Sequence, residues 1–167
     1  RDDTPYAHAS FGKLAVWPTG RAFRPGDALA WSQDPQGELH WERDGQALWV
    51  AAEQAGRCHA WRHALADGTF TRAIEGGWVQ ALAVAGAGAG ATVLSVRDGA
   101  GHPARAYLHH GGTERRLDHF NDALLRRVSL GRTEVHEVPG AQGDALQLWV
   151  TYPPGFDRRR RHPVLQV

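Results

Sequence analysis

The sequence contains very little of several residue types, and each shortage excludes a class of structure. Only Cys58 is a cysteine among the 167 residues, so no disulfide can form within the chain. No apolar run approaches the roughly 18 residues that a membrane-spanning helix needs, so we expect no membrane partner. The net charge of +1 gives no overall attraction to nucleic acid, so we expect no nucleic-acid partner either.

Methionine is absent, and Lys13 is the only lysine. Because the chain starts at Arg1 without an initiator methionine, we expect it to be cut from a longer polypeptide. The residues that are abundant suit a β fold. Seven tryptophans favour a layered β core. Twenty glycines agree with many tight turns. Cys58 lies in a predicted strand, where we expect a buried and inert thiol.

Two segments of the chain read as copies of one unit. The first covers residues 39–75 and the second residues 78–120, each with short apolar strands between glycine turns. Gly56 corresponds to Gly101, an offset of 45 residues. Four short strands repeating every ~40–45 residues is the spacing of a β-propeller blade. A propeller closes with about four to eight blades, so two clear blades predict an incomplete propeller in a mainly β fold.

The repeat makes specific predictions. Residues 46–118 should form two antiparallel sheets of three or four strands, packed face to face and without a long helix. Side chains on the apolar runs should be buried: Trp41, Leu48, Val50, Leu82, Val93 and Leu94. The charged residues at the end of the second unit should be exposed: Glu114, Arg115 and Arg116.

Three other regions are less regular. In residues 1–37, short strands are possible at 12–17 and 28–32, followed by turn residues 34–37. The Gly/Ala loop 85–90 reads as a flexible hairpin tip. A phosphate-binding glycine loop would need a helix after it, and a strand is predicted there instead.

Beyond Asp122 the repeat pattern stops. Residues 133–138 and 145–152 alternate as strands, and a third strand is expected at 163–167. We therefore place a domain boundary near 121–127. Residues 1–122 are expected to be the C-terminal part of a β-propeller domain, and residues 123–167 a linker and the first strands of a second domain.

Several segments around this boundary resemble a known family. They are residues 119–125, 133–135, 149–157 and 162–167. Together they are similar to the propeller-to-hydrolase junction of the prolyl oligopeptidase family of serine peptidases, and in particular to bacterial dipeptidyl aminopeptidases and acylaminoacyl peptidases. The blades of that family carry a Trp-Ser-Pro-Asp-Gly turn. Residues 41–45 match this turn except at Glu42 and Arg43.

The resemblance covers roughly residues 38–167, and it implies a β-propeller followed by an α/β-hydrolase domain. It implies hydrolysis of short peptides by a serine that a histidine activates, with the propeller restricting access. The partners would be the remainder of the parent polypeptide and a peptide substrate, and no cofactor would be needed. In the family, the strand matching 164–167 precedes the oxyanion loop and the whole triad. We therefore assign no catalytic, cofactor-binding or metal-binding residue, and we expect this chain alone to be inactive.

Other candidate chemistry is weaker. The run His109–Gly112 is similar to an oxyanion loop, but it aligns with a hairpin turn of the first unit. His59 and His63 are four apart, which would place them about 13 Å apart on a strand, too far to share a metal. None of the four serines lies in a G-x-S-x-G motif. The basic run 158–161 is expected to be a solvated loop.

An alternative reading remains open, in which the chain is a stand-alone β-propeller interaction module without catalysis. The tail at 153–167 favours the peptidase reading, because a closed propeller does not need it. We also expect the chain to be stable only beside the remainder of its parent polypeptide, since an incomplete propeller leaves apolar sheet faces and edges uncovered.

Overall fold

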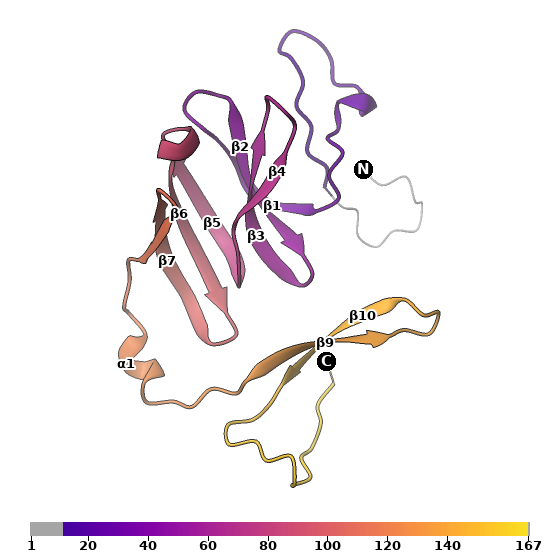
Figure 1. Ribbon diagram of the computed structural model, residues 1–167, viewed down its shortest axis with the longest axis vertical. Coiled ribbons are helices and arrows are strands. Elements are labelled where there is room, and N and C mark those ends of the chain that lie inside the picture. Colours follow the sequence, from indigo (N-terminus) through magenta and orange to yellow (C-terminus); the bar gives the residue numbers. More distant parts are fainter. Residues whose placement is uncertain (1–11, 167) are drawn as a thin grey trace. The chain divides into compact units, whose positions relative to one another are not determined.

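The computed structural model describes residues 12–166 and is mainly β (Figure 1). Within this range, helical structure is limited to two three-residue 3-10 turns and one α-helical turn. The chain divides into two compact units, which we describe separately. The first comprises residues up to Gly99 together with Ala104–Asp118, and the second comprises Ala100–Pro103 and the residues from His119 onward.

The first unit is built from two successive antiparallel β-meanders of four strands each (Figure 1). The first meander consists of β1 (Asp34–Trp41), β2 (Ala47–Gln54), β3 (Arg57–Ala64) and β4 (Phe70–Ile74). The second meander consists of β5 (Trp78–Ala85), β6 (Thr92–Gly99), β7 (His102–His110) and β8 (Thr113–Arg116). In each meander, every strand pairs with its neighbour in the sequence.

Two-residue turns close one hairpin in each meander. Ala55 and Gly56 join β2 to β3, and both have positive φ angles, 50° and 68°. Gly111 and Gly112 join β7 to β8 with φ angles of 55° and 75°. Two consecutive positive φ angles are the geometry of a type I′ turn, which matches the twist of antiparallel strands. The glycine run after His110 is therefore a hairpin turn.

In the sheet ladder, one parallel residue pair connects the two meanders, Cys58 of β3 with Trp78 of β5. This contact makes one eight-stranded sheet, where two separate sheets were predicted. The reason is that β4 pairs only with residues 60–63 of β3. The edge of β3 beside Cys58 stays free, and β5 begins against it.

The main core lies between the two meanders. On the side of the first meander it contains Trp49 and Ala51 of β2, and Ala60 of β3. On the side of the second meander it contains Val79 of β5 and Val93 of β6. The meanders therefore pack face to face, as predicted.

A second core covers the opposite face of the first meander. Val50, Ala52 and Trp61 pack there against residues of the preceding segment, including Leu14 and Trp31. Both faces of β2 are consequently buried, which explains why this strand is apolar along most of its length.

The predicted burial was right at some positions and wrong at others. Leu48, Val50 and Val93 are buried. Trp41 is 49% exposed because it ends β1, an edge strand, and Leu94 is 38% exposed because it points away from the first meander.

Three further positions complete the comparison. Leu82, predicted to be buried, is half-buried. Glu114 and Arg115 are exposed, as predicted. Arg116 is only partly exposed, because its guanidinium lies 3.7 Å from the carboxylate of Asp118.

Leu48 gives a direct test of this packing. Because the side chain is almost fully buried in β2, we expect Leu48→Ala to lower the free energy of unfolding by about 2–5 kcal/mol. Urea unfolding followed by tryptophan fluorescence measures the change. The matched control is Leu65→Ala, at an exposed turn position, which should cost well under 1 kcal/mol. Equal effects of the two substitutions would contradict the assigned register.

The segment before β1 contains less strand than expected. The two predicted strands in residues 12–32 are reduced to an isolated bridge between Ala15 and Ala28. Residues 34–37, predicted as a turn, belong to β1, where Gly37 adopts a positive φ angle of 73° within a bulge. A bulge accommodates turn-forming residues inside a strand. The start of the chain, including Ser10, lies outside the described residues.

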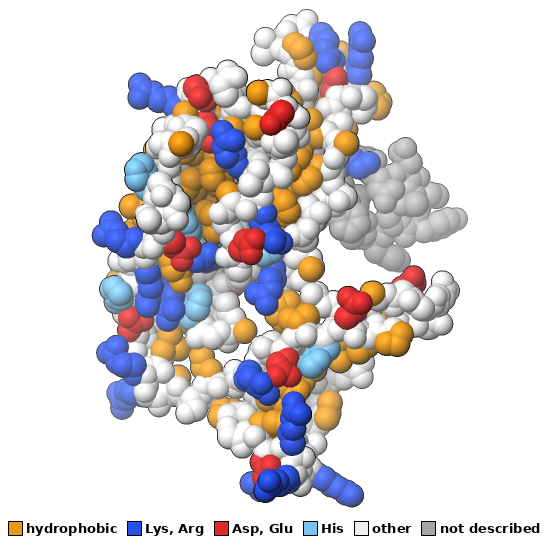
Figure 2. All heavy atoms as spheres, viewed as in Figure 1, with side chains coloured by type: hydrophobic (Ala, Val, Ile, Leu, Met, Phe, Trp, Pro, Cys, Tyr) orange, Lys and Arg blue, Asp and Glu red, His pale blue; other side chains and the backbone are white. Residues whose placement is uncertain are grey.

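The second unit contains α1 (Asp122–Leu125) and a hairpin of β9 (Thr133–Pro139) and β10 (Ala145–Thr151). The hairpin confirms the two strands predicted there. Figure 2 shows hydrophobic side chains at its surface, and Val135, Leu146 and Leu148 are each more than 40% exposed. Residues 163–166 were predicted as a strand but have no regular structure, because no neighbouring strand pairs with them. Val167 lies outside the described residues.

Candidate functional site

A groove with a volume of about 540 Å³ opens between the two meanders. Its apolar floor consists of Trp49 and Ile74 of the first meander and Val93 of the second. Its rim is polar and includes Glu75, Arg97, His109, His110, Thr113 and Glu114. We call this cavity the inter-meander groove.

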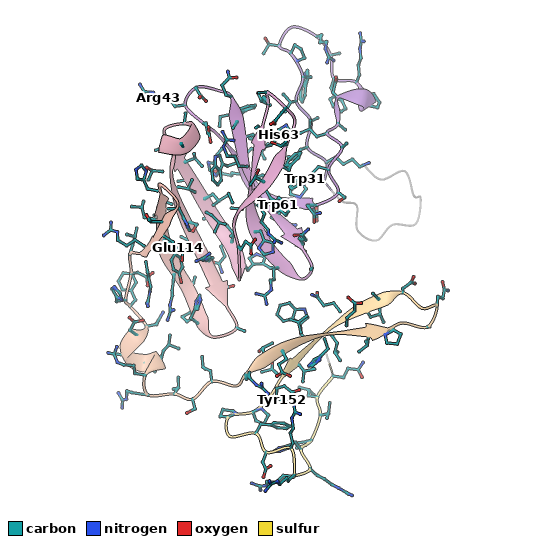
Figure 3. All side chains as sticks on the ribbon, viewed as in Figure 1. Trp31, Arg43, Trp61, His63, Glu114 and Tyr152 are labelled. Carbon is teal, nitrogen blue, oxygen red and sulfur yellow. The ribbon has the colours of Figure 1, made fainter. Side chains whose placement is uncertain are left out.

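Three residues of the second meander form a chain that has the order of a catalytic triad. Ser95 Oγ lies 2.8 Å from His109 Nε2, and His109 Nδ1 lies 3.5 Å from a carboxylate oxygen of Glu114. Glu114, labelled in Figure 3, also accepts a hydrogen bond from Arg97. The sequence did not predict this arrangement, because the three residues match no motif.

The geometry nevertheless excludes Ser95 as a nucleophile in this conformation. Its side chain has 0% exposure, so no substrate carbonyl can reach Oγ. Burial lowers the pKa of His109 below its usual value, with Arg97 acting in the same direction and Glu114 opposing it. The hydrogen bond between Ser95 Oγ and His109 Nε2 gives the buried Ser95 hydroxyl a partner. The Ser95–His109–Glu114 cluster therefore stabilises the second meander.

A second polar cluster is centred on Glu42, whose carboxylate is fully buried. One carboxylate oxygen accepts hydrogen bonds from Trp49 Nε1 at 2.9 Å and Arg62 Nε at 2.7 Å. The other accepts from Arg62 Nη2 at 3.0 Å and from the backbone N–H of Gly88 at 2.8 Å. Glu42 thus links the first meander to the loop between β5 and β6 of the second.

These donors strongly favour the ionised carboxylate. The pKa of Glu42 falls to about 2, chiefly because of the hydrogen bonds from Arg62, with Gly88 and Trp49 adding to the effect and burial opposing it. A carboxylate with four good donors compensates for the loss of its hydration.

The same contacts fix the Gly/Ala loop, which the sequence predicted to be flexible. The backbone N–H of Arg43, labelled in Figure 3, donates to the carbonyl of Gly86 at 2.9 Å. Together with the Gly88 contact, this bond ties the loop to the first meander at two points. Because the Gly88 N–H already donates to a carboxylate, the loop does not offer that group to a phosphate.

Cys58 has the environment of an inert thiol. It is fully buried in the main core, and burial raises its pKa to about 11, with Glu53 contributing. We expect the native protein to leave Cys58 unmodified by Ellman's reagent at pH 8 for hours, because both access and thiolate are lacking. In 6 M guanidinium the thiol should react within minutes. Rapid labelling of the folded protein would contradict the placement of β3.

Two other histidines, His59 and His63, lie outside these polar clusters. His59 accepts a hydrogen bond from the Gly76 N–H at Nδ1, and burial lowers its pKa. His63 stacks on Phe70 at 4.2 Å, and Figure 3 shows it near Trp61. Among residues 12–166 no group of three or more His, Cys, Asp or Glu side chains could hold a metal ion.

In the second unit, Arg158–Arg161 are exposed beside a turn that begins at Asp157. No helix in the described range is long and apolar enough to cross a membrane.

Comparisons with known proteins give a likeness of fold. No family model matches the sequence, and no curated protein does. Among solved structures, the acylaminoacyl peptidase of Pyrococcus horikoshii matches 72% of this chain with a TM-score of 0.59 and 15% identity. The AtxE2 isopeptidase matches 75% with 14% identity, but its TM-score of 0.36 is too low to indicate a shared fold. The chain spans 18% and 25% of these two proteins, respectively. Its backbone is therefore similar to a minor part of an acylaminoacyl peptidase.

Proposed function

We propose that these residues are part of a serine peptidase of the prolyl oligopeptidase family, of the dipeptidyl aminopeptidase or acylaminoacyl peptidase type. The parent enzyme would hydrolyse short peptides, and its propeller would restrict access to the active site. The observation that carries the proposal is the backbone likeness to the acylaminoacyl peptidase over 72% of the chain. The sequence resemblance over residues 38–167 supports the same family from side-chain patterns.

In this proposal the two meanders are propeller blades. Each has four antiparallel strands in sequence order, and the two pack face to face through apolar side chains. Residues 1–122 then form the C-terminal part of the propeller. Residues 123–167 form the linker and the first strands of the α/β-hydrolase domain, which agrees with the exposed apolar residues of the β9–β10 hairpin.

The catalytic residues belong to the remainder of the parent polypeptide. Ser32 and Ser129 are exposed, but neither has a histidine hydrogen-bonded to it among the described residues. Ser95 has one but is inaccessible. In this proposal the remainder supplies the serine, aspartate and histidine, as well as the other blades. Such a triad uses side chains alone and requires no cofactor.

The test compares the 167-residue chain with the full product of its gene. We expect the full product to react with a fluorophosphonate probe and to cleave chromogenic dipeptidyl or acylaminoacyl substrates. The chain alone should do neither. Mass spectrometry should place the probe on a serine outside these 167 residues.

Ser95→Ala in the full product is the matched control and should retain the activity. Probe attachment within the 167 residues would overturn the proposal. A full product that neither reacts nor cleaves would favour the alternative of a propeller interaction module.

A further inference from the structure

The inter-meander groove has walls that hydrogen bonds hold in place. Trp49, on the floor, donates from Nε1 to Glu42, which fixes its ring. Glu42 also accepts the N–H of Gly88, which fixes the β5–β6 loop at one wall. At another wall, Arg97 Nη1 donates to the backbone carbonyl of Glu75 at 2.7 Å. The shape of the groove is therefore set before a ligand arrives, and a preformed site costs little to order on binding.

The rim of the groove presents negative charge to solvent. The lining side chains include two carboxylates, Glu75 and Glu114, and one guanidinium, Arg97. In both ion pairs at the rim the carboxylate is the more exposed partner. The Glu114 side chain is 41% exposed against 14% for Arg97, and Glu75 is 63% exposed against 38% for Arg72. A ligand that approaches from solvent meets carboxylates first, so the groove is complementary to a cation.

One wall of the groove ends at a free strand edge. β4 pairs with β3, and no strand of the described range pairs with the other edge of β4. Ala73, which is exposed and lines the groove, has no residue opposite it because the β3–β4 register shifts there. Such an edge offers backbone N–H and C=O groups to an extended segment of another chain.

We propose that the inter-meander groove binds an extended segment of a partner protein in which an apolar side chain lies two residues from a Lys or Arg. The apolar side chain enters the floor formed by Trp49, Ile74 and Val93, and the cation meets the carboxylates of Glu75 and Glu114. Side chains at positions i and i+2 of a strand point to the same face, so one segment reaches both.

The dimensions and charge of the groove favour this occupant. Its volume of about 540 Å³ lies within the range of ligand sites and holds a few side chains. An anionic ligand such as a phosphate would meet the exposed carboxylates of Glu75 and Glu114 and be repelled. The inference goes beyond the proposed function and does not depend on peptidase activity.

Titration calorimetry with end-blocked peptides tests the proposal on the full gene product. The product is first treated with a fluorophosphonate, so that a peptidase site cannot cleave the probes. The probes are Thr-Leu-Thr-Lys-Thr and two controls, one with Ser in place of Leu and one with Glu in place of Lys. We expect saturable binding of the first peptide and at least about tenfold weaker binding of both controls.

Two substitutions change the groove itself. Glu75→Lys reverses the charge of the rim, and Ala73→Trp places a large side chain at the wall; each should weaken binding of the first peptide by about tenfold or more. The matched controls are Glu38→Lys on β1 and Thr71→Trp on β4, both at exposed positions that do not line the groove. These should bind within about twofold of the unmodified product. The urea midpoint of each variant reports whether it is folded, and Glu75→Gln replaces any groove variant that is not.

Three results would overturn the proposal. The first is the lack of saturable binding by the Leu peptide and by its Val, Ile and Phe versions. The second is equal affinity for the Lys and Glu peptides. The third is unchanged binding by the folded groove variants. Reaction with the fluorophosphonate is read separately on the same product, so a failed groove assignment is distinguished from a failed peptidase assignment.

Discussion

Replacing Glu42 with alanine is expected to lower the free energy of unfolding by roughly 3–5 kcal/mol. The substitution removes a fully buried carboxylate and leaves the guanidinium of Arg62, the Trp49 indole N–H and the Gly88 amide without their acceptor. Arg62 remains partly exposed and can regain some hydration, which favours the lower end of the range. Urea unfolding followed by tryptophan fluorescence measures the loss. The measurement can be made on the full gene product. It can also be made on the 167-residue chain if that chain unfolds cooperatively.

The matched control is Glu38→Ala, which removes an exposed carboxylate from β1. Surface substitutions of this kind usually change stability by no more than about 0.5 kcal/mol. Hydrogen exchange should also separate the variants, because loss of Glu42 frees the Gly88 amide whereas loss of Glu38 does not. A Glu42→Ala protein as stable as the control, with Gly88 still protected, would refute the link between the meanders.

Acid is expected to destabilise the first unit in two stages. His59 and His109 have pKa values lowered from 6.5, so below that pH the unfolded state binds protons that the folded state resists. Glu42 acts at lower pH. Its pKa is about 2 in the fold against 4.5 when unperturbed, so its contribution is intact above pH 4.5 and is lost as the pH falls toward 2. That span corresponds to about 3 kcal/mol.

The measurement is the urea midpoint at pH 8, 7, 6, 5, 4 and 3. We expect a plateau above pH 7, a shallow decline below 6.5 and a steeper one below 4.5. His59→Asn should weaken the first stage, and Glu42→Gln should remove most of the second. Stability that rises between pH 6.5 and pH 4 would contradict both assignments.

The sequence predicted the meanders well because their signals are local. Glycine turns and short apolar runs specify adjacent hairpins. The 45-residue offset between Gly56 and Gly101 relates the first meander to the second. The burial of individual side chains and the formation of the last strand depend on tertiary contacts, which the sequence pattern does not reveal. Leu94 is as apolar as Leu48, but Leu48 is 2% exposed whereas Leu94 is 38% exposed. Residues 163–166 have the composition of a strand but no partner strand. Strand formation depends more on pairing with a neighbouring strand than on the β-propensity of the residues.

The polar clusters were not predictable for a related reason. Glu42 appears in the sequence only as a departure from a Trp-Ser-Pro-Asp-Gly turn, and nothing local links it to Arg62 or to Gly88, 46 positions away. Ser95, His109 and Glu114 likewise meet only after β6, β7 and β8 have paired. Such contacts depend on strand register, which a single sequence does not specify at the level of individual side chains.

The pairing of each strand with its sequence neighbour also bears on how the chain reaches its fold. Within each meander the longest loop to be closed is a hairpin connection of a few residues, so the entropy cost of each step is small. The Cys58–Trp78 pair spans only 20 positions and can form once β3 and β5 exist. We therefore expect the first meander to assemble while the second is still being synthesised, with early contacts of short sequence separation. The Glu42–Gly88 bond can then form once the β5–β6 loop has been synthesised.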